Sequence, residues 1–469
     1  MEVTLINHSS LLFKLKDSKY TFLTDFWNQT PAFGSWLPSA LPFYNPTYLA
    51  GLSYKPNFFL VISHAHDDHI DDYFLKKYFN KDMKIIINKF PSPSLAKRVK
   101  QMGFDNVILI DKEKDFKDFQ VMSVVDERMS NDDSSLVFRD KKYCIHHGND
   151  NWFKLRKDNL KKIKIFSKNR ILLYAAQTNS ASGHPITYPN LKDRQKLLKD
   201  KVKNMLLTGF ENTKNLNANY FLPYAGYSKA YVKGKNYQDE AFDPTYENLL
   251  NLINKGDKVT NKKKLVNIFP GGSLNLKNGK VTYPFNYDPN DIIKITDKYM
   301  HGEKVIEKCD TFNQDFNLEL DKPEYVSDYL KEFNTFVNQY LERFPKFYPE
   351  VIGKKLRFTI VNKNNEKIMS SMEIGSGALC VNKTMVNKEF IIPSNLFRAV
   401  VEKKIVFENL YTGYEAEINR HPINEYNRGI LIFLDMFGYK YKKSISNNYH
   451  EAWSAFWHLD RISILKSTF

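Results

Sequence analysis

The sequence lacks several features that would fix its class at once. Its 469 residues include three cysteines, Cys144, Cys309 and Cys380, which are too few and too scattered for a disulfide framework or a cysteine-based metal site. With only 19 glycines and 19 prolines, the chain is neither collagen-like nor dominated by linkers. It contains no stretch of about 18 uncharged apolar residues, so we expect no membrane span.

Targeting and nucleic-acid motifs are also missing. The first residues do not form a basic run followed by an apolar block and a small-residue cleavage site, so we expect a cytoplasmic location and a reducing compartment. Neither a zinc finger nor a basic region with heptads occurs, which argues against sequence-specific nucleic-acid binding. The charge is nevertheless strongly positive, because 69 Lys and Arg outnumber 53 Asp and Glu and give a net charge of +16. This excess fits either a solvated lysine-rich surface or attraction of an anionic substrate.

Apolar runs alternate with amphipathic segments over residues 1–285, and this alternation predicts an α/β layer structure. Residues 3–25 predict a hairpin that turns at the polar residues 16–19. Residues 58–64 read as a buried strand, and the segment 71–79 that follows reads as a helix.

The remainder, residues 286–469, predicts a C-terminal α+β region packed on the first domain. Residues 326–344 have apolar side chains at helical spacing, and residues 355–374 read as a hairpin with an Asn-rich turn. No fixed-period repeat is visible.

One short segment after the buried strand concentrates the side chains that bind metals. It places His64, His66, Asp68 and His69 within six residues. His64 and His66 are two residues apart, so in an extended segment their side chains point to the same side. Imidazole and carboxylate groups suit iron, zinc or manganese. The segment therefore predicts one or two metal ions.

The segment His64-Ala65-His66-Asp67-Asp68-His69 resembles the HxHxDH signature of the metallo-β-lactamase superfamily. The resemblance implies an αββα sandwich with the metal site at one edge of its two sheets. Five sequence blocks more narrowly resemble the family of CMP-sialic acid hydroxylases: residues 62–78, 180–189, 222–227, 269–280 and 410–422. In that family, a metallo-β-lactamase-like region accompanies a Rieske iron–sulfur domain, and this chain has no Cys/His pairs for such a cluster.

The chain departs from the superfamily pattern at its later metal motifs. Asp126 or Glu127 stands where a histidine is usual, and a carboxylate there favours iron over zinc. Asn149 occupies the place of the bridging aspartate, so Asp150, or His146 or His147, is expected to bind instead. The last histidine of the pattern is missing near residues 222–234, where Tyr227 stands, and His184 is a possible substitute.

These features predict an iron-dependent oxygenase of monooxygenase type that hydroxylates a small substrate, which the resemblance implies is a nucleotide-linked sugar. Its electrons would come from an external donor such as a ferredoxin or a reductase. One alternative is a zinc hydrolase of an ester, amide or phosphodiester, in which Asp67 or Asp68 orients the attacking water. A second alternative is a binding protein with a decayed metal site.

The substrate side of the site is expected to include His184, Tyr227, Lys229 and Lys233. The lysines follow the segment 222–227, whose end should lie at the metal-bearing edge of the sheets. We therefore expect them to contact the phosphate of a nucleotide-linked sugar.

Overall fold

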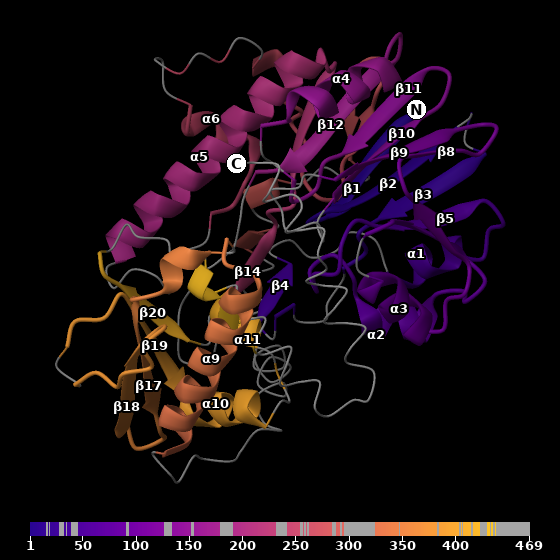
Figure 1. Ribbon diagram of the computed structural model, residues 1–469. Helices are drawn as coiled ribbons and strands as arrows, with labels where there is room; N and C mark the ends of the chain where they lie inside the picture. The colour runs from indigo at the N-terminus through magenta and orange to yellow at the C-terminus, as the bar shows by residue number, and fades with distance from the viewer. Residues whose placement is uncertain are drawn as a thin grey trace.

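Two packed β-sheets and a smaller C-terminal sheet form this protein, as a computed structural model shows (Figure 1). None of the helices among the described residues is long and apolar enough to cross a bilayer. The structure describes residues 1–437 apart from 16, 18, 28–31, 34, 39–45, 91–92, 126–133, 152–153, 179–190, 231–241, 254–256, 258, 260–261, 284–287, 291–292, 295–323, 347, 382–383, 403–404, 406, 414–415, 423–428, 432 and 435–436.

The first layer is an eight-stranded sheet with the order β16-β15-β1-β2-β3-β5-β6-β7. Strands β3, β5, β6 and β7 run parallel, and the remaining pairs are antiparallel. The strands are β1 Glu2–Asn7, β2 Ser10–Leu15, β3 Tyr20–Thr24, β5 Phe58–Ile62, β6 Lys84–Asn88, β7 Val107–Ile110, β15 Ser273–Asn275 and β16 Val281–Thr282.

The second layer is a six-stranded sheet with the order β13-β12-β11-β10-β9-β8. Strands β11, β12 and β13 are parallel, and the rest are antiparallel. The strands are β8 Glu113–Asp115, β9 Gln120–Val125, β10 Ser134–Arg139, β11 Tyr143–His147, β12 Ile171–Gln177 and β13 Tyr220–Tyr224.

Apolar side chains fill the space between the two sheets. Phe13, Phe22 and Val61 of the first sheet meet Phe138 and Ile145 of the second in one cluster. Helices cover the outer faces: α1–α3 pack on the first sheet and α4–α6 on the second. Their bounds are α1 Pro46–Leu52, α2 Asp72–Tyr78, α3 Ser94–Gln101, α4 Lys157–Phe166, α5 Leu191–Leu216, α6 Tyr246–Asn251 and the short 3₁₀ turn η3 Lys262–Lys264. This arrangement confirms the expected αββα sandwich.

The structure corrects one local prediction near the amino terminus. Residues 3–25 contain three strands and not two, because the chain also turns at His8 and Ser9 between β1 and β2. The polar residues Asn7 to Ser10 interrupt the apolar pattern there. The extra turn brings His8 to the edge at which the sheets meet.

The C-terminal region has its own four-stranded sheet, with the order β18-β17-β19-β20, and a core formed mainly with helix α9. The expected boundary near residue 285 falls among residues that the structure does not describe, so it stays a prediction. The elements are α9 Glu324–Arg343, η4 Pro349–Val351, β17 Lys355–Val361, β18 Lys367–Glu373, β19 Lys388–Pro393, α10 Ser394–Val401, α11 Phe407–Thr412 and β20 Glu417–Arg420.

The C-terminal region packs directly on the first domain. Trp27 and Trp36 are buried in the same core cluster as α9 and the four-stranded sheet. The indole N–H of Trp36 donates to the carbonyl of Thr412 at 2.6 Å. Trp36 belongs to a two-stranded ladder of β4 Trp36–Pro38 and β14 Ser228–Ala230. The ladder thus lies between the sandwich and the C-terminal core.

Helix α5 packs so closely on β13 that Gly209 has no room for a side chain. A Cβ atom at this position would overlap the ring of Phe221. We expect Gly209→Ala to lower the free energy of unfolding by about 1–3 kcal/mol through overpacking, although alanine favours helix by about 1 kcal/mol. Gly51→Ala in α1 is the matched control, because no heavy atom lies within 4 Å of its Cβ position. Denaturant unfolding of both variants measures the difference, and equal effects would contradict the packing.

Candidate metal centre

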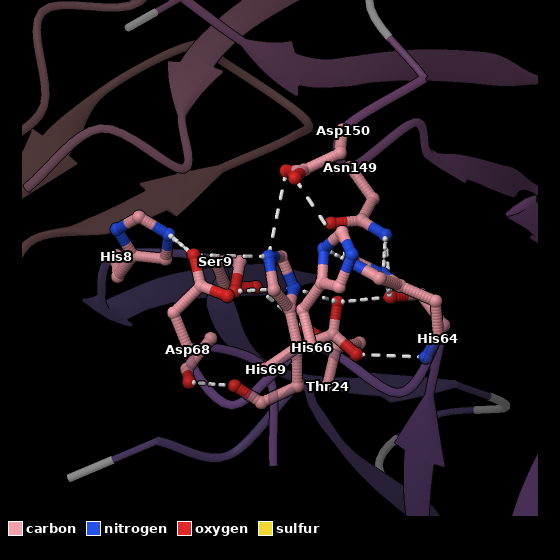
Figure 2. Close-up of polar contacts among 12 residues, drawn as sticks. His8, Ser9, Thr24, His64, His66, Asp68, His69, Asn149 and Asp150 are labelled. Carbon is pink, nitrogen blue, oxygen red and sulfur yellow. Dashed lines mark hydrogen bonds and ion pairs between the residues drawn. The ribbon is translucent and has the colours of Figure 1, made fainter. Parts of the chain in front are cut away.

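The candidate site lies where strands from both sheets end at a common edge. Asp25 follows β3, and His64 comes two residues after β5. From the second sheet, His147 ends β11, and Asp150 follows in the next turn. Parallel strands present their carboxyl ends at the same edge, which is why residues far apart in the sequence meet here. Figure 2 shows the side chains of His64 and Asp150 in one cluster with that of His8.

The loop with the HxHxDH signature is held from the outside by Arg98 of α3. Its guanidinium donates to the carbonyl of Ala65 at 2.5 Å, to Asp67 at 3.0 Å and to Asp72 at 3.1 Å. The carboxylate of Asp67 is therefore paired with Arg98 and is 44% exposed. The structure thus shows Asp67 paired with Arg98, and its expected catalytic role stays a prediction.

Two groups of side chains have the composition and spacing of metal ligands. One contains His8, Asp68 and His69, and the other contains His64, His66 and Asp150. Within each group the candidate ligand atoms lie within 4.8 Å of one another. The predicted residues His64, His66, Asp68, His69 and Asp150 thus lie together, and His8 joins them.

Asp150 faces both groups, whereas Asn149 does not. The Oδ1 atom of Asp150 lies 3.4 Å from His69 Nε2, and its Oδ2 atom lies 3.9 Å from His64 Nε2. Asn149 has a φ of 55° and turns its amide toward Ser63 Oγ and His64 Nδ1. Because Asn149 adopts this left-handed conformation, the next residue presents its carboxylate to the cluster. The backbone thus accounts for a carboxylate one residue later than the superfamily pattern has it.

The buried carboxylate of Asp25 fixes the orientation of His69. Asp25 accepts hydrogen bonds from the backbone N–H and the hydroxyl of Ser63, both at 2.8 Å. Its Oδ2 atom is also 3.2 Å from His69 Nδ1. When Nδ1 donates its proton to Asp25, the Nε2 lone pair of His69 points into the cluster.

The two histidines at the end of β11 are engaged elsewhere. His147 has Nε2 at 2.8 Å from Asp25 and Nδ1 at 2.6 Å from the hydroxyl of Tyr224. Neither ring nitrogen is left for a metal ion, so we remove His147 from the expected ligands. His146 instead contacts Ser135 Oγ at 3.0 Å and packs beside Tyr174, on the other face of the sheet.

The charges within the site favour a cation. Burial alone would raise the pKa of Asp25 and Asp68, but nearby histidines hold the pKa of Asp68 down to about 2 and that of Asp25 lower still. Burial would lower the pKa of His69, yet Asp68 and Asp150 raise it well above its ordinary value. The carboxylates thus stabilise positive charge at the position of His69, and a metal ion can supply that charge in place of the proton.

Unpaired buried atoms show that the cluster fits a metal ion. His8 Nδ1 and Nε2, Asp68 Oδ1, His69 Nε2 and Asp150 Oδ1 are buried and have no hydrogen-bond partner among the described residues. Leaving a buried polar atom unsatisfied costs about 1–3 kcal/mol. Imidazole nitrogens and carboxylate oxygens are the ligands of iron, manganese and zinc, so one ion can satisfy several of these atoms.

Two of the expected substrate residues, Tyr227 and Lys229, have other partners in the described part of the chain. Tyr227 is buried against Phe269, and its hydroxyl donates to the carbonyl of Pro244 at 3.1 Å. Lys229 has a side chain that is 3% exposed and lies 3.3 Å from Asp243, so it is not presented to a phosphate. The expected residues Asp126, Glu127, His184 and Lys233 lie outside the described part of the chain.

Sequence reasoning missed three residues near the cluster: His8, Asp25, whose carboxylate contacts His69, and Lys201 of α5. The first two are signalled by polar residues that directly follow apolar strands. Burial lowers the pKa of Lys201 to about 7, while Asp150 raises it and Arg420 lowers it further. Lys201 therefore lies within electrostatic range of both Asp150 and Arg420, a relation that no local sequence pattern indicates.

We expect the double change His64→Ala and His66→Ala to remove most bound metal, with affinity reduced by about tenfold or more, while the chain stays folded. The two residues lie beyond the end of β5 and outside the apolar clusters, so the sandwich does not depend on them. Elemental analysis and circular dichroism measure the two outcomes. Full metal content in a folded double variant would contradict the ligand assignment.

The buried His146 predicts how metal-free stability changes with pH. Burial lowers the pKa of His146 to about 3. Below pH 6.5 this histidine therefore binds a proton in the unfolded chain but not in the folded chain. This contribution to stability is complete above pH 6.5 and is lost as the pH falls toward 3. Between about pH 6.5 and 5 it amounts to about 2 kcal/mol, since one pH unit corresponds to about 1.36 kcal/mol.

Denaturant unfolding of the metal-free wild type and of His146→Gln at pH 7 and 5 tests this. We expect a smaller loss of stability on acidification in His146→Gln. The exposed His421→Gln is the control and should keep the wild-type pH dependence. Identical pH dependence in all three proteins would contradict the prediction.

Comparison with known proteins supports the resemblance to the CMP-sialic acid hydroxylases that the sequence blocks indicate. No family model matches the chain. It is 24% identical over 459 residues to the cytidine monophosphate-N-acetylneuraminic acid hydroxylase of Xenopus laevis, covering 90% of this chain and 70% of that protein. A protein of Mycolicibacterium smegmatis, named as a Rieske 2Fe-2S iron–sulfur protein, is 30% identical over 106 residues, or 23% of this chain. This chain spans about a fifth, 19%, of that relative's length.

Among solved structures, one from Veillonella parvula, described as a metal-dependent hydrolase, has a TM-score of 0.38 and 12% identity. The match covers 58% of this chain and 98% of that one. The resemblance indicated by the sequence blocks is thus confirmed, and over nine tenths of its length the chain is similar to a CMP-N-acetylneuraminic acid hydroxylase.

Proposed function

We propose that this chain is an iron-dependent oxygenase that hydroxylates a small anionic substrate of the nucleotide-linked sugar class. The observation that carries the proposal is the composition of the two ligand groups. Each group has two histidines and one aspartate. Two histidines and one carboxylate with open positions are the ligand set of many non-haem iron oxygenases.

The cluster also supports a functional site over a decayed one. Asp25, His69 and His64 are fully or almost fully buried, at 0%, 0% and 1% exposed. A site that no longer bound metal would gain stability by pairing its buried polar atoms with one another or by replacing them with apolar groups. Here Asp68 Oδ1, His69 Nε2 and Asp150 Oδ1, which belong to the two ligand groups, have no hydrogen bond among the described residues.

Bound iron would supply the redox chemistry that activates dioxygen. The residues of the chain hold and shelter that centre. Asp25 keeps His69 in the tautomer whose Nε2 faces the cluster. The ring centroids of Trp27 and Phe33 lie 5.3 Å from that of His8 and 5.9 Å from that of His66, so an aromatic ring lies beside each ligand group.

Positive side chains near the cluster support an anionic substrate. Lys201 of α5 lies within electrostatic range of Asp150 and of Arg420 in the C-terminal sheet. A phosphate or carboxylate bound near Lys201 would favour the protonated form of this lysine and would be attracted by it and by Arg420. These residues replace Lys229 as the candidates for substrate charge recognition.

An external electron donor is part of the proposal. Hydroxylation places one atom of dioxygen in the substrate and reduces the other to water, so an electron pair must be delivered. The three cysteines of this sequence are far apart and do not form the Cys/His pairs of a Rieske cluster. The similar hydroxylase and the Rieske-named relative support a ferredoxin-like or Rieske-type partner.

The test uses the full chain loaded with Fe²⁺ under anaerobic conditions. It is mixed with CMP-N-acetylneuraminate, a ferredoxin and its reductase, and isotope-labelled dioxygen. We expect a product that contains one labelled oxygen atom, and we expect none from the His64→Ala, His66→Ala double variant. Mass spectrometry of the product measures the incorporation.

The zinc-loaded chain, assayed with ester, amide and phosphodiester substrates, is the parallel experiment. Turnover there, together with no oxygen incorporation by the iron-loaded chain across nucleotide-linked sugars, would overturn the oxygenase proposal in favour of a hydrolase. Zinc and iron compete for similar ligands, so the reaction and not the affinity decides between them.

A further inference from the structure

We propose that His8 is a metal ligand and completes the second metal position together with Asp68 and His69. This inference rests on the proposed function as a metal enzyme. It assigns to the turn between β1 and β2 the role that the superfamily pattern gives to its last histidine, which this chain lacks.

His8 is placed as a ligand would be. Its side chain is almost fully buried, and its Nε2 atom lies 3.3 Å from Asp68 Oδ2. Its ring centroid is 5.6 Å from that of His69, at an interplanar angle of 75°. Figure 2 shows the three side chains facing one space on the side of the cluster opposite His64.

A simple ion pair with Asp68 does not account for this placement. Both ring nitrogens of His8 are buried without a hydrogen-bond partner among the described residues, and the same is true of Asp68 Oδ1 and His69 Nε2. The ion pair of His8 Nε2 with Asp68 Oδ2 leaves His8 Nδ1, Asp68 Oδ1 and His69 Nε2 without a hydrogen bond. A cation among the three residues would satisfy His8 Nε2, an oxygen of Asp68 and His69 Nε2 together.

The backbone places His8 beside the position where the last histidine is missing. The amide of Ala225, directly after β13, donates to the carbonyl of His8 at 2.7 Å. The strand that should supply a histidine therefore lies against the turn that supplies one. Tyr227, two residues further on, points into the core between the sheets and does not replace it.

The turn is also rigid enough to hold a ligand. Ser9 Oγ lies 3.1 Å from His69 Nδ1, and Ser10 Oγ donates to the carbonyl of Asp25 at 2.5 Å. The ring of Trp27 meets His8 edge-on, with ring centroids 5.3 Å apart. These contacts fix the imidazole before any ion binds, so metal binding costs little side-chain conformational entropy.

The resulting centre has two positions that share Asp150. One position has His64, His66 and Asp150, and the other has His8, Asp68 and His69. An oxygen of Asp150 is 3.4 Å from His69 Nε2, so this carboxylate reaches the second position as well. The proposal predicts that His8 governs the second metal ion and leaves the first in place.

The experiment counts metal ions in the full chain. Wild type, His8→Ala and His8→Gln are loaded with Mn²⁺ under anaerobic conditions. Elemental analysis then gives the number of metal ions per chain, and electron paramagnetic resonance shows whether the ions are coupled. We expect two ions and exchange-coupled Mn²⁺ in wild type. In the His8 variants we expect one uncoupled ion, with binding of the second weakened by about 10-fold to 100-fold.

His146→Gln is the matched control, because His146 is equally buried but lies outside both ligand groups, and it should keep two coupled ions. Two coupled ions at wild-type affinity in both His8 variants would overturn the proposal, and so would a wild type that binds a single ion. If His8→Ala does not fold, His8→Gln decides, because glutamine retains size and polarity.

A positive signature separates direct ligation from a structural role. In His8→Cys loaded with Co²⁺, a thiolate bound to the ion gives a charge-transfer absorption band that wild type lacks. Absence of this band in a folded, Co²⁺-loaded variant would count against ligation by residue 8. A chain with two His8-dependent ions but no hydroxylase activity would keep this inference and refute only the proposed function.

Discussion

The carboxylate of Asp25 joins the strand ends on which the candidate centre depends. It accepts from Ser63 after β5 and from His147 at the end of β11, and it contacts His69 in the signature loop. These contacts connect the first sheet to the second at one edge. A fully buried carboxylate is unfavourable unless several donors satisfy it, so the edge of the sandwich and the orientation of His69 are fixed by the same group.

The hydrogen bonds around Asp25 also determine which nitrogens remain for a metal ion. The backbone N–H of Asn149 donates to the hydroxyl oxygen of Tyr224. The proton of this hydroxyl is then directed to His147 Nδ1. With Nδ1 accepting from Tyr224, His147 donates from Nε2 to Asp25, so both of its ring nitrogens are engaged. His69 uses only Nδ1 in this network and keeps Nε2 for the cluster. Two histidines with similar burial thus have different roles because of what contacts their second nitrogen.

The local part of this centre could be predicted from the sequence, whereas of the non-local candidate ligands only Asp150 is expected from it and His8 is not. His64, His66, Asp68 and His69 are neighbours in one loop, so their spacing alone indicates a shared site. The choice of Asp150 over Asn149 depends on a left-handed residue, which shifts the carboxylate by one position. His147 has a suitable position in sequence, but its ring nitrogens are taken by Asp25 and Tyr224. The two-sheet sandwich followed from alternating strands and helices, whereas the turn at His8 did not, because Asn7 to Ser10 were read as part of one strand.

The C-terminal region contributes to the centre through aromatic residues that belong to both parts of the molecule. Trp27 is buried in the C-terminal core cluster and also meets His8 edge-on. Phe33 packs on the same cluster and lies beside His66. A histidine from each ligand group is therefore in contact with a ring that the C-terminal core holds in place. Because closely packed cores transmit small displacements, a change in the packing of helix α9 would reach both groups at once. The C-terminal core thus holds two rings that lie beside the candidate metal centre, and Figure 1 shows this region next to the sandwich.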